Sequence, residues 1–373
     1  MSYPEQFQGF AINNPKDWAT PKLTSYQPKN FGAHDVDIEV ECCGICASEL
    51  FALQNGWSHG EMACLSSKYG PKTQVVGHEV VGKVVAVGPE VKLCKVGDRV
   101  GLGAQASACM NCTRCNSNNE QYCAQAVSTY CDFYPDGYVS QGGYASHVRA
   151  HEHLCFPIPP ELPSELVAPL QCGGLTVYSP IKRNIAGKKD PKVAVIGIGG
   201  LGHMAIMISK ALGAEVYAFS RGYSKKDDAI KMGADHFVAT GEKNWSENLG
   251  DTFDLILNCA SSTTSLDLNA LLPCLKVNCN FVSVGLPHID EDLKVKPFSF
   301  FANGCNMGSS KLGSREEAIE LMNLAVKHNF RPWVETIQVS EAGVSDGLTR
   351  LNDGDVKYRF TLTGFHQFFG TGK

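Results

Sequence analysis

Residues 193–202 read VAVIGIGGLG, and this stretch indicates the fold of the second half of the chain. Its apolar start predicts a short buried strand, and the apolar pattern after the glycines predicts a helix through residue 212. Glycines let the backbone approach a pyrophosphate, which then lies at the N-terminus of the helix. The strand–turn–helix context favours a dinucleotide site over a glycine-rich turn without a ligand. The candidate cofactor-binding residues are Gly197, Gly199, Gly200, Leu201 and Gly202.

Strands and helices alternate around this stretch. Strand-like segments lie at 215–219, 236–239, 253–259 and 281–285, and helical segments lie at 227–232 and 314–328. This alternation predicts an α/β fold in which a parallel sheet is connected by right-handed crossovers.

The end of the second strand selects the form of the cofactor. An Asp or Glu at that point would bond the ribose 2′-hydroxyl of NAD. This chain has Ser220 and Arg221 instead, with Lys225 close behind. A hydroxyl, a guanidinium and an ammonium suit a 2′-phosphate, so we expect NADP(H). The alternative is a solvated basic loop.

The first 160 residues follow a different pattern, which predicts mostly β-structure with tight turns. Val36, Ile38 and Val40 alternate with acidic residues, which predicts a half-buried strand at 36–41. Glycine-bounded, strand-like runs follow at 80–87 and 96–102.

Two domains are expected from the length of 373 residues. A cluster of prolines between residues 157 and 163 indicates a boundary, and the strand-like segments 334–339 and 358–363 are expected to return to the first domain. The predicted division is a mostly-β domain at 1–166 and 334–373 and a nucleotide-binding domain at 167–333.

The spacing C-x-x-C-x-x-C-x7-C is the strongest metal-binding motif. It is formed by Cys109, Cys112, Cys115 and Cys123 in a region rich in Asn, Ser and Thr. Four thiolates can close a tetrahedral zinc site with no open position, which is the arrangement of a structural zinc. Four free thiols in a loop are the alternative interpretation.

A second candidate metal site is dispersed along the chain. Cys46, His78 and Cys172 each lie close to glycine, and Glu79 follows the histidine directly. Taken singly, each would also suit an ordinary buried position. Together, two thiolates and an imidazole would leave one open position on a catalytic zinc. Such a zinc is a Lewis acid toward an alkoxide or a carbonyl.

The overall composition excludes several classes of protein. The net charge is −5 and no Lys/Arg cluster occurs, so a nucleic-acid partner is not expected. No apolar run is long enough for a membrane span, and the N-terminus lacks the pattern of a secretory signal. With sixteen cysteines and no export signal, we expect a reducing, cytoplasmic compartment and metal ligation rather than disulfides.

These motifs together resemble the zinc-dependent medium-chain alcohol dehydrogenases. The branch is that of the cinnamyl alcohol dehydrogenases and the fungal broad-specificity NADP-dependent alcohol dehydrogenases. The resemblance covers nearly the whole chain. The resemblance rests on the glycine–histidine–glutamate stretch at 77–91, the four-cysteine motif, residues 168–180 (APLQCGGLTVYSP), the glycine-rich turn at 197–202 and residues 357–361 (KYRFT).

The resemblance implies a GroES-like catalytic domain, a Rossmann domain that binds NADP(H), two zinc ions per chain, and a homodimer formed through the nucleotide domains. Cys46, His78 and Cys172 would hold the catalytic zinc, and Glu79 would approach it when the site is empty. Ser48 matches the hydroxyl that passes the proton of the bound alcohol. Glu49 matches an acid behind the metal ligands, Thr176 a residue near the nicotinamide, and Arg359 a cofactor contact.

The implied reaction is reversible hydride transfer between NADP(H) and a primary alcohol or aldehyde. Aliphatic, branched and aromatic substrates are expected, including cinnamaldehyde-like ones, with aldehyde reduction as the main direction. A polyol or secondary alcohol dehydrogenase of the same superfamily is one alternative. A catalytically silent protein that binds dinucleotide or zinc is the other.

Two features depart from the family pattern. Relatives often carry a relay histidine a few residues after Ser48, whereas this chain has Phe51 in that region. The segment 57–73, which contains Cys64 and Tyr69, is about ten residues longer than is usual in the family. It would either shape the mouth of the pocket or be an inert surface insertion.

Overall fold

The computed structural model describes residues 4–57, 61–263 and 266–370, and it contains two compact units. Unit 1 comprises Met1–Cys172 and Ser314–Lys373, and unit 2 comprises Gly173–Gly313. These boundaries differ from the expected domain limits of 167 and 333, because the helix at 315–328 packs with unit 1. The expected functional domains remain a prediction. Of the long segment 57–73, residues 58–60 lie outside the described part of the chain.

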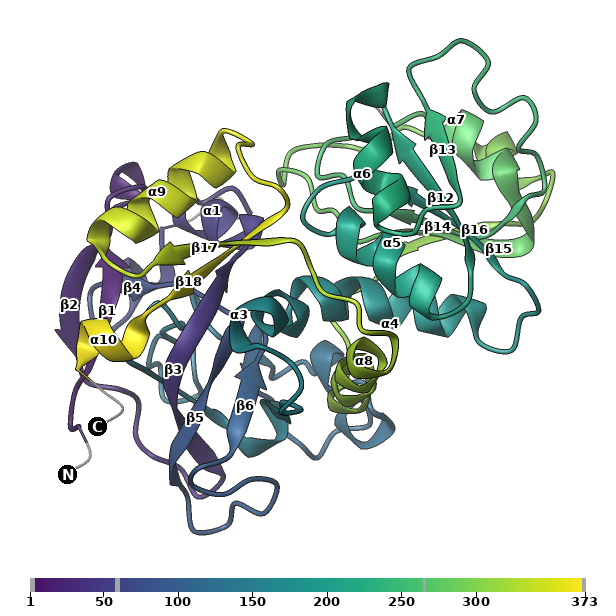
Figure 1. The fold of residues 1–373 in the computed structure, drawn as a ribbon. Coiled ribbons are helices and arrows are strands. Elements are labelled where there is room, and N and C mark those ends of the chain that lie inside the picture. Colours follow the sequence, from purple (N-terminus) through teal and green to yellow (C-terminus); the bar gives the residue numbers. More distant parts are fainter. Residues whose placement is uncertain (1–3, 58–60, 264–265, 371–373) are drawn as a thin grey trace. The chain divides into compact units, whose positions relative to one another are not determined.

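Unit 1 is built on mostly antiparallel sheet, in which only the pairing of β17 with β18 is parallel among the described strands (Figure 1). Its main sheet has the strand order β10-β6-β5-β3-β18-β17, and β9 also pairs with β3. The pairing of β18 with β3 confirms that the C-terminal strands return to the N-terminal sheet. The bounds are β3 Asp35–Ile45, β5 Val80–Val87, β6 Arg99–Leu102, β9 His147–His151, β10 Cys155–Pro157, β17 Val334–Gln338 and β18 Arg359–Thr363.

Smaller elements complete unit 1. A three-stranded sheet has the order β2-β1-β4, and β7 pairs with β8. These strands are β1 Phe7–Ile12, β2 Lys22–Tyr26, β4 Gln74–Val75, β7 Gln105–Ser107 and β8 Val127–Ser128. The helices are α1 Ala47–Leu53, α2 Ala63–Ser66, α3 Ser164–Val167, α8 Arg315–His328, α9 Glu341–Asn352 and α10 Phe365–Phe369.

Strand β3 corrects the expectation of a half-buried strand. Its apolar side chains are buried as predicted, but Asp37 and Glu39 are buried too, with 0% and 7% exposure. β3 pairs with β5, β9 and β18 along its edges, and the burial of successive side chains along it shows that both of its faces are covered. Asp37 is accommodated because Arg149 of β9 donates two hydrogen bonds to it, at 2.7 and 2.8 Å. Such pairing offsets the cost of burying a carboxylate.

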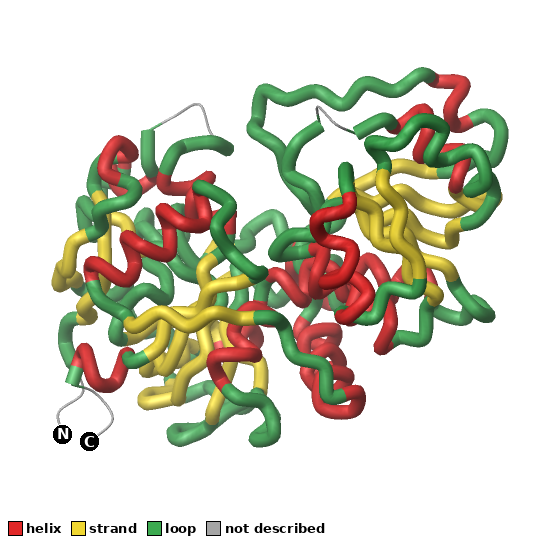
Figure 2. Tube along the Cα trace, turned by 45° about the horizontal axis from the view of Figure 1, so that its top comes forward, coloured by secondary structure: helices red, strands yellow, loops and turns green. Residues whose placement is uncertain are grey.

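Unit 2 is a six-stranded parallel sheet with helices outside it (Figure 2), which confirms the predicted α/β fold. The order β13-β12-β11-β14-β15-β16 corresponds to 3-2-1-4-5-6 along the chain, the order of dinucleotide-binding sheets. The strands are β11 Lys192–Ile196, β12 Glu215–Ser220, β13 His236–Ala239, β14 Phe253–Asn258, β15 Leu275–Ser283 and β16 Asn306–Ser309. The helices are α4 Gly173–Ile185, α5 Gly202–Ala211, α6 Lys226–Lys231 and α7 Leu268–Leu271.

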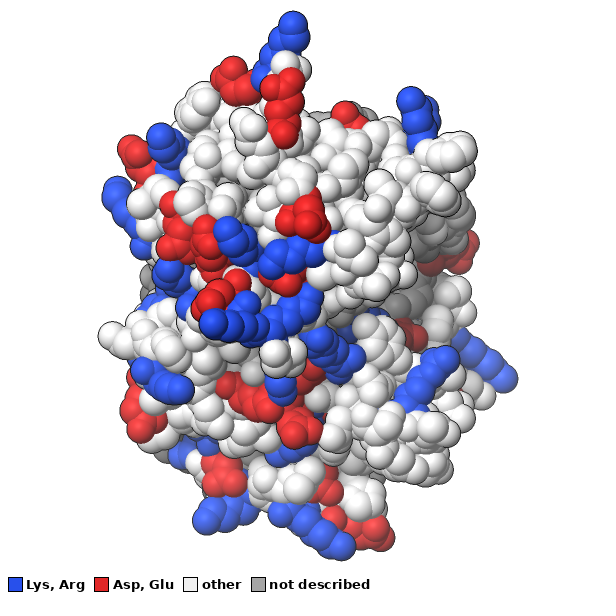
Figure 3. Space-filling model, turned by 90° about the vertical axis from the view of Figure 1, so that its right-hand side faces the viewer, with Lys and Arg blue, Asp and Glu red and all other residues white. Residues whose placement is uncertain are grey.

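Among the described residues, no helix combines the length and apolar character needed to span a membrane. Figure 3 shows one face of the protein, on which basic and acidic side chains are interspersed. That face therefore lacks the single-sign basic stripe of a nucleic-acid-binding surface.

Candidate functional site

Four residues from three distant segments of the chain meet inside unit 1. One ligand atom from each of Cys46, His78, Glu79 and Cys172 lies within 4.8 Å of the others. Cys46 lies between β3 and α1, the His–Glu pair precedes β5, and Cys172 follows a short 3-10 helix at Ala168–Gln171. All four are buried, with exposures of 8% or less. The structure thus brings together the ligand set that the sequence could only assemble by hypothesis.

The chemistry of this cluster fits a zinc ion. His78 Nε2 lies 3.0 Å from Cys172 Sγ, and two thiols with one imidazole form a catalytic zinc's ligand set. A hydrogen bond from Cys172 holds the pKa of the Cys46 thiol well below its usual range, so a thiolate forms readily there. The thiolate is the form that binds metal.

Glu49 contacts two of the candidate ligand residues, Cys46 and His78, and orients them. Its carboxylate accepts a hydrogen bond from the backbone N–H of Cys46 and lies 2.8 Å from His78 Nδ1. When Nδ1 donates to a carboxylate, Nε2 is left as the free ligand atom of the neutral ring. Glu49 itself is fully buried, so the contact is shielded from water.

Glu79 lies beside the cluster, where Arg359 pairs with its carboxylate and Gly44 leaves room for it. The guanidinium of Arg359 forms an ion pair with the Glu79 carboxylate, and both residues are buried. Gly44 leaves room for this carboxylate, since a Cβ there would lie 2.1 Å from Glu79 Oε2. Burial raises the pKa of Glu79 to about 8, although Arg359 acts in the opposite direction. Arg359 therefore contacts the cluster, which sequence reasoning missed, and its role toward the cofactor remains a prediction.

Ser48 lies at the edge of the cluster. Its Oγ is 3.3 Å from His78 Nε2, and its side chain is half-buried. Phe51, on the same helix, stacks on Trp57 with ring centroids 4.9 Å apart. Neither of these rings can carry a proton onward as a histidine would, so the relay seen in many relatives is absent from this part of α1.

The four-cysteine motif forms a second, closed cluster. Neighbouring sulfurs are 3.5 to 3.9 Å apart among Cys109, Cys112, Cys115 and Cys123. Four sulfurs about 2.3 Å from a central zinc would lie roughly 3.8 Å from one another. The spacing therefore fits a structural zinc with all four positions filled.

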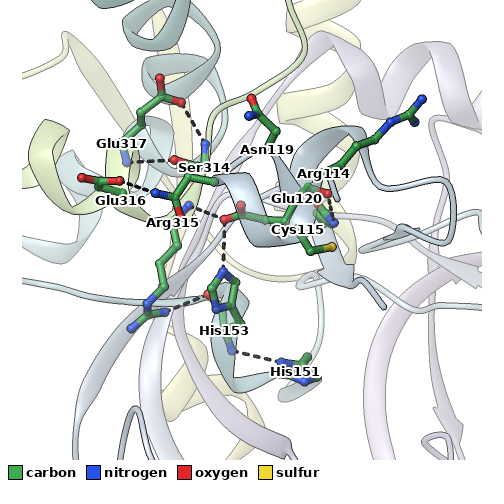
Figure 4. Close-up of polar contacts among 12 residues, drawn as sticks. Arg114, Cys115, Asn119, Glu120, His151, His153, Ser314, Arg315, Glu316 and Glu317 are labelled. Carbon is green, nitrogen blue, oxygen red and sulfur yellow. Dashed lines mark hydrogen bonds and ion pairs between the residues drawn. The ribbon is translucent and has the colours of Figure 1, made fainter. Parts of the chain in front are cut away.

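The four-cysteine lobe is tied to the start of α8 (Figure 4). Glu120 accepts a hydrogen bond of 2.6 Å from the backbone N–H of Arg315 and lies 3.2 Å from His153 Nε2. The Arg315 guanidinium donates to the carbonyls of His153 and Cys155, at 2.8 and 2.6 Å. Sequence reasoning missed this contact because nearly two hundred residues separate its two sides.

The glycine-rich turn of unit 2 has the geometry of a phosphate-binding loop. Gly197 has a φ of +85°, and a Cβ at Gly202 would lie 1.8 Å from the Gly197 carbonyl oxygen. Nothing lies within 4 Å of where a Cβ at Gly199 would be, which leaves its side of the turn open. Lys225 Nζ donates to the Ile198 carbonyl at 2.6 Å, so this lysine lies beside the turn.

The remaining predicted cofactor residues belong to unit 2. Ser220 ends β12, which pairs in parallel with β11, so it lies at the same sheet edge as the glycine-rich turn. Arg221 is exposed and available to a ligand. Thr176 lies in α4 and is half-buried. The chain is therefore equipped with two metal clusters in unit 1 and a dinucleotide turn in unit 2.

Comparisons with known proteins agree with this arrangement. Residues 32–160 match the alcohol dehydrogenase GroES-like domain, and residues 200–327 match the zinc-binding dehydrogenase domain. NADP-dependent alcohol dehydrogenase 6 of Saccharomyces cerevisiae is 48% identical over 371 residues, which is 99% of each chain. CAD from Helicobacter pylori, solved with NADP(H), has a TM-score of 0.83 at 31% identity and covers 96% of this chain and 98% of its own. A Sorghum bicolor cinnamyl alcohol dehydrogenase has a TM-score of 0.86 at 29% identity, covering 96% and 97%.

Proposed function

The chain belongs to the zinc-binding, medium-chain alcohol dehydrogenase family, and we propose that it transfers hydride between NADP(H) and primary alcohols or aldehydes. The observation that carries this proposal is the buried Cys46–His78–Cys172 cluster. Three ligands of this type leave one position for a substrate oxygen, unlike the closed four-cysteine cluster. A zinc ion bound there would act as a Lewis acid that polarises a carbonyl or stabilises an alkoxide.

The surrounding side chains would orient and protonate the substrate. Glu49 keeps His78 in the tautomer that presents Nε2 to the cluster. The hydroxyl of Ser48 lies beside that nitrogen and would exchange a proton with the substrate oxygen. Glu79, paired with Arg359, can approach the ligands when no substrate oxygen is present. Phe51 lies on α1 where the family pattern often has a relay histidine, and its ring cannot take the proton onward from Ser48.

NADP(H) is supported as the cofactor by the residues after β12. A 2′-phosphate would accept hydrogen bonds from Ser220 and Arg221, with Lys225 adding positive charge. Thr176 would lie near the nicotinamide, and Arg359 would contact the cofactor. The yeast relative is named as NADP-dependent, and the Helicobacter structure contains NADP(H).

The cofactor proposal is tested by Arg221→Ala. Loss of a charge-assisted hydrogen bond should raise the Michaelis constant for NADPH by about ten- to a hundredfold. The constant for NADH should change less than about twofold. Lys226→Ala, which removes a nearby charge that we do not assign to the cofactor, is the matched control. An equal effect of Arg221→Ala on both cofactors would remove this residue from the 2′-phosphate site.

A panel of substrates tests the reaction itself. With NADPH, aliphatic, branched and aromatic aldehydes, including cinnamaldehyde, should be reduced, and polyols and ketones should react poorly with the corresponding cofactor. Preference for polyols would favour the polyol dehydrogenase alternative. Binding of NADPH without turnover of any substrate would favour the catalytically silent alternative.

The edge of the unit 2 sheet supports a homodimer. β16 is the last strand in its sheet order, and exposed apolar side chains lie in the segments that flank β15 and β16. Phe298 and Phe301 are 83% and 84% exposed, and Leu286 and Ile289 are about half exposed. A second copy would cover these rings and pair the open edge. Sedimentation should give twice the monomer mass.

A cytoplasmic location also remains a proposal, supported by the sixteen free thiols, which suit a reducing compartment.

A further inference from the structure

The imidazole of His203 contacts the glycine-rich turn from inside unit 2. His203 is the second residue of α5, and its side chain is fully buried. Its Nδ1 atom lies 2.9 Å from the Gly200 carbonyl oxygen and 3.2 Å from the Gly199 carbonyl oxygen. Because a carbonyl oxygen can only accept, Nδ1 carries a proton in these contacts and donates it. A buried side chain thus holds two carbonyls of the turn.

The place of His203 in the helix explains this reach. Side chains of an α-helix tilt toward its N-terminus, so a residue in the first turn covers the residues three and four positions before it. Helix α5 packs against β11, β12 and α4 (Figure 1). The imidazole is therefore held by the core of unit 2 and not by the turn that it contacts.

The contact fixes the direction of two peptide N–H groups. In a trans peptide the C=O and N–H bonds point in opposite directions. Since the Gly199 and Gly200 carbonyls point inward to His203, the N–H groups of Gly200 and Leu201 point outward. Both residues are partly exposed, and neither N–H has a backbone acceptor among the described residues. Outward-pointing N–H groups at the start of a helix are the donors that bind a pyrophosphate.

The Gly200 carbonyl depends on the imidazole more than the Gly199 carbonyl does. The Gly199 carbonyl also accepts the backbone N–H of His203, at 3.0 Å. Within the described chain, the Gly200 carbonyl accepts only from His203 Nδ1. A carbonyl that loses its partner turns toward water, and glycine lets its peptide rotate at little steric cost. Such a rotation would turn an oxygen toward the phosphates and the Leu201 N–H away from them.

We propose that His203 is a positioning residue of the cofactor site. By holding the Gly199 and Gly200 carbonyls inward, it directs the N–H groups of Gly200 and Leu201 at the pyrophosphate of the dinucleotide. The inference rests on the proposed function, because it assumes that a dinucleotide binds at this turn. The pyrophosphate is common to both cofactors, so His203 contributes equally to the binding of NADPH and NADH, unlike Arg221.

The test removes the donor with His203→Leu, which keeps an apolar side chain in the buried position. The affinities for NADPH and for NADH, measured by fluorescence titration, should both fall about three- to tenfold, the effect of losing one buried hydrogen bond. Adenosine 2′-monophosphate, which has the 2′-phosphate but no pyrophosphate, should bind as it does to the wild type. In kinetics, the loss should appear in the Michaelis constant for NADPH and not in the turnover number.

Two variants control for a general loss of structure. His203→Asn places an amide nitrogen near the position of Nδ1 and should bind both cofactors within about twofold of the wild type. Ser209→Ala removes a buried hydroxyl from the same helix that has no hydrogen-bond partner among the described residues, and it should change no affinity. A crystal structure of His203→Leu should show the Gly200 carbonyl rotated outward, a result that is independent of activity.

A further variant covers the case in which His203→Leu fails to fold. His203→Gln carries its amide one bond further from the backbone than Asn does, so it is less well placed to donate to the Gly200 carbonyl. It should bind NADPH at least about threefold more weakly than His203→Asn. Equal affinities of these two variants would count against the inference.

Three results for a folded His203→Leu variant would overturn the inference. They are unchanged affinities for both cofactors, a loss confined to one of them, and an equal loss of affinity for adenosine 2′-monophosphate. Failure of His203→Asn to restore binding would also overturn it. A wild-type protein that binds neither dinucleotide would instead refute the proposed function.

Discussion

The two metal clusters of unit 1 are built in opposite ways. The Cys46–His78–Cys172 cluster draws its ligands from distant segments and is buried beside the main sheet. The four-cysteine cluster takes all its ligands from fifteen consecutive residues, 109–123, in a lobe with little core. Within the described chain, the large buried core cluster of unit 1 has no fully buried member between Ala106 and Val139. The fold therefore holds the first cluster, whereas metal would have to hold the lobe.

The two clusters are therefore expected to differ in role: the buried cluster serves catalysis, and the four-cysteine cluster serves the stability of its lobe. A site that the fold supports can lose its metal and keep its shape. A lobe without a core depends on its metal for its structure, because zinc binding and folding are then coupled. Removing one ligand from each cluster should give contrasting results.

The largest effect is expected from Cys46→Ala. Loss of a catalytic ligand should reduce turnover to background, while NADPH still binds to unit 2. The unfolding free energy should change by less than about 1 kcal/mol, because the sheet and Glu49 still hold the site. Kinetics, a fluorescence titration with NADPH and thermal unfolding provide the three measurements. Activity retained by this variant would remove the cluster from the reaction.

A large effect of another kind is expected from Cys112→Ser. The lobe should lose its metal, and the protein should lose about 3 kcal/mol or more of unfolding free energy. Activity per folded, zinc-loaded molecule should decline much less than in Cys46→Ala. Cys94→Ser, a half-exposed thiol outside both clusters, is the control and should behave as wild type. A stable, inactive Cys112→Ser protein would reverse the roles of the two clusters.

An intermediate effect is expected from Glu49→Gln, which weakens the orientation of His78 without removing a ligand. Zinc affinity of the buried cluster should fall about ten- to a hundredfold. The four-cysteine cluster should keep its affinity, so a competitive chelator should remove one zinc ion from the variant before the other. Equal release of both ions would contradict the role assigned to Glu49.

The smallest effect is expected where the lobe meets α8. Glu120→Ala removes the acceptor for the Arg315 N–H and should cost about 1–2 kcal/mol of unfolding free energy. Asn118→Ala removes an exposed contact with Glu316 in the same region and should cost less than about 0.5 kcal/mol. Denaturant unfolding compares the two. Equal costs would show that Glu120 does not anchor the lobe.

The contrast between features within one short segment and contacts between distant segments also explains what could be predicted from the sequence. The four-cysteine spacing and the glycine-rich turn are local, so their geometry follows from residues close together in the chain. The contacts of Glu79 with Arg359 and of Glu120 with Arg315 join distant segments, and no local pattern predicts them. The burial of Asp37 was missed for a related reason, since its partner Arg149 lies on another strand. The dispersed zinc ligands were proposed from cysteine and histidine residues that lie close to glycine, the family resemblance supported them, and the fold brings them together.

A metal count with matched variants tests the central claim most directly. Wild-type protein should contain two zinc ions per chain, Cys46→Ala should contain one with the fold intact, and Cys112→Ser should keep one with the fold weakened. A wild-type protein with a single zinc ion, bound only by the four-cysteine lobe, would contradict the assignment of Cys46, His78 and Cys172 to a catalytic metal.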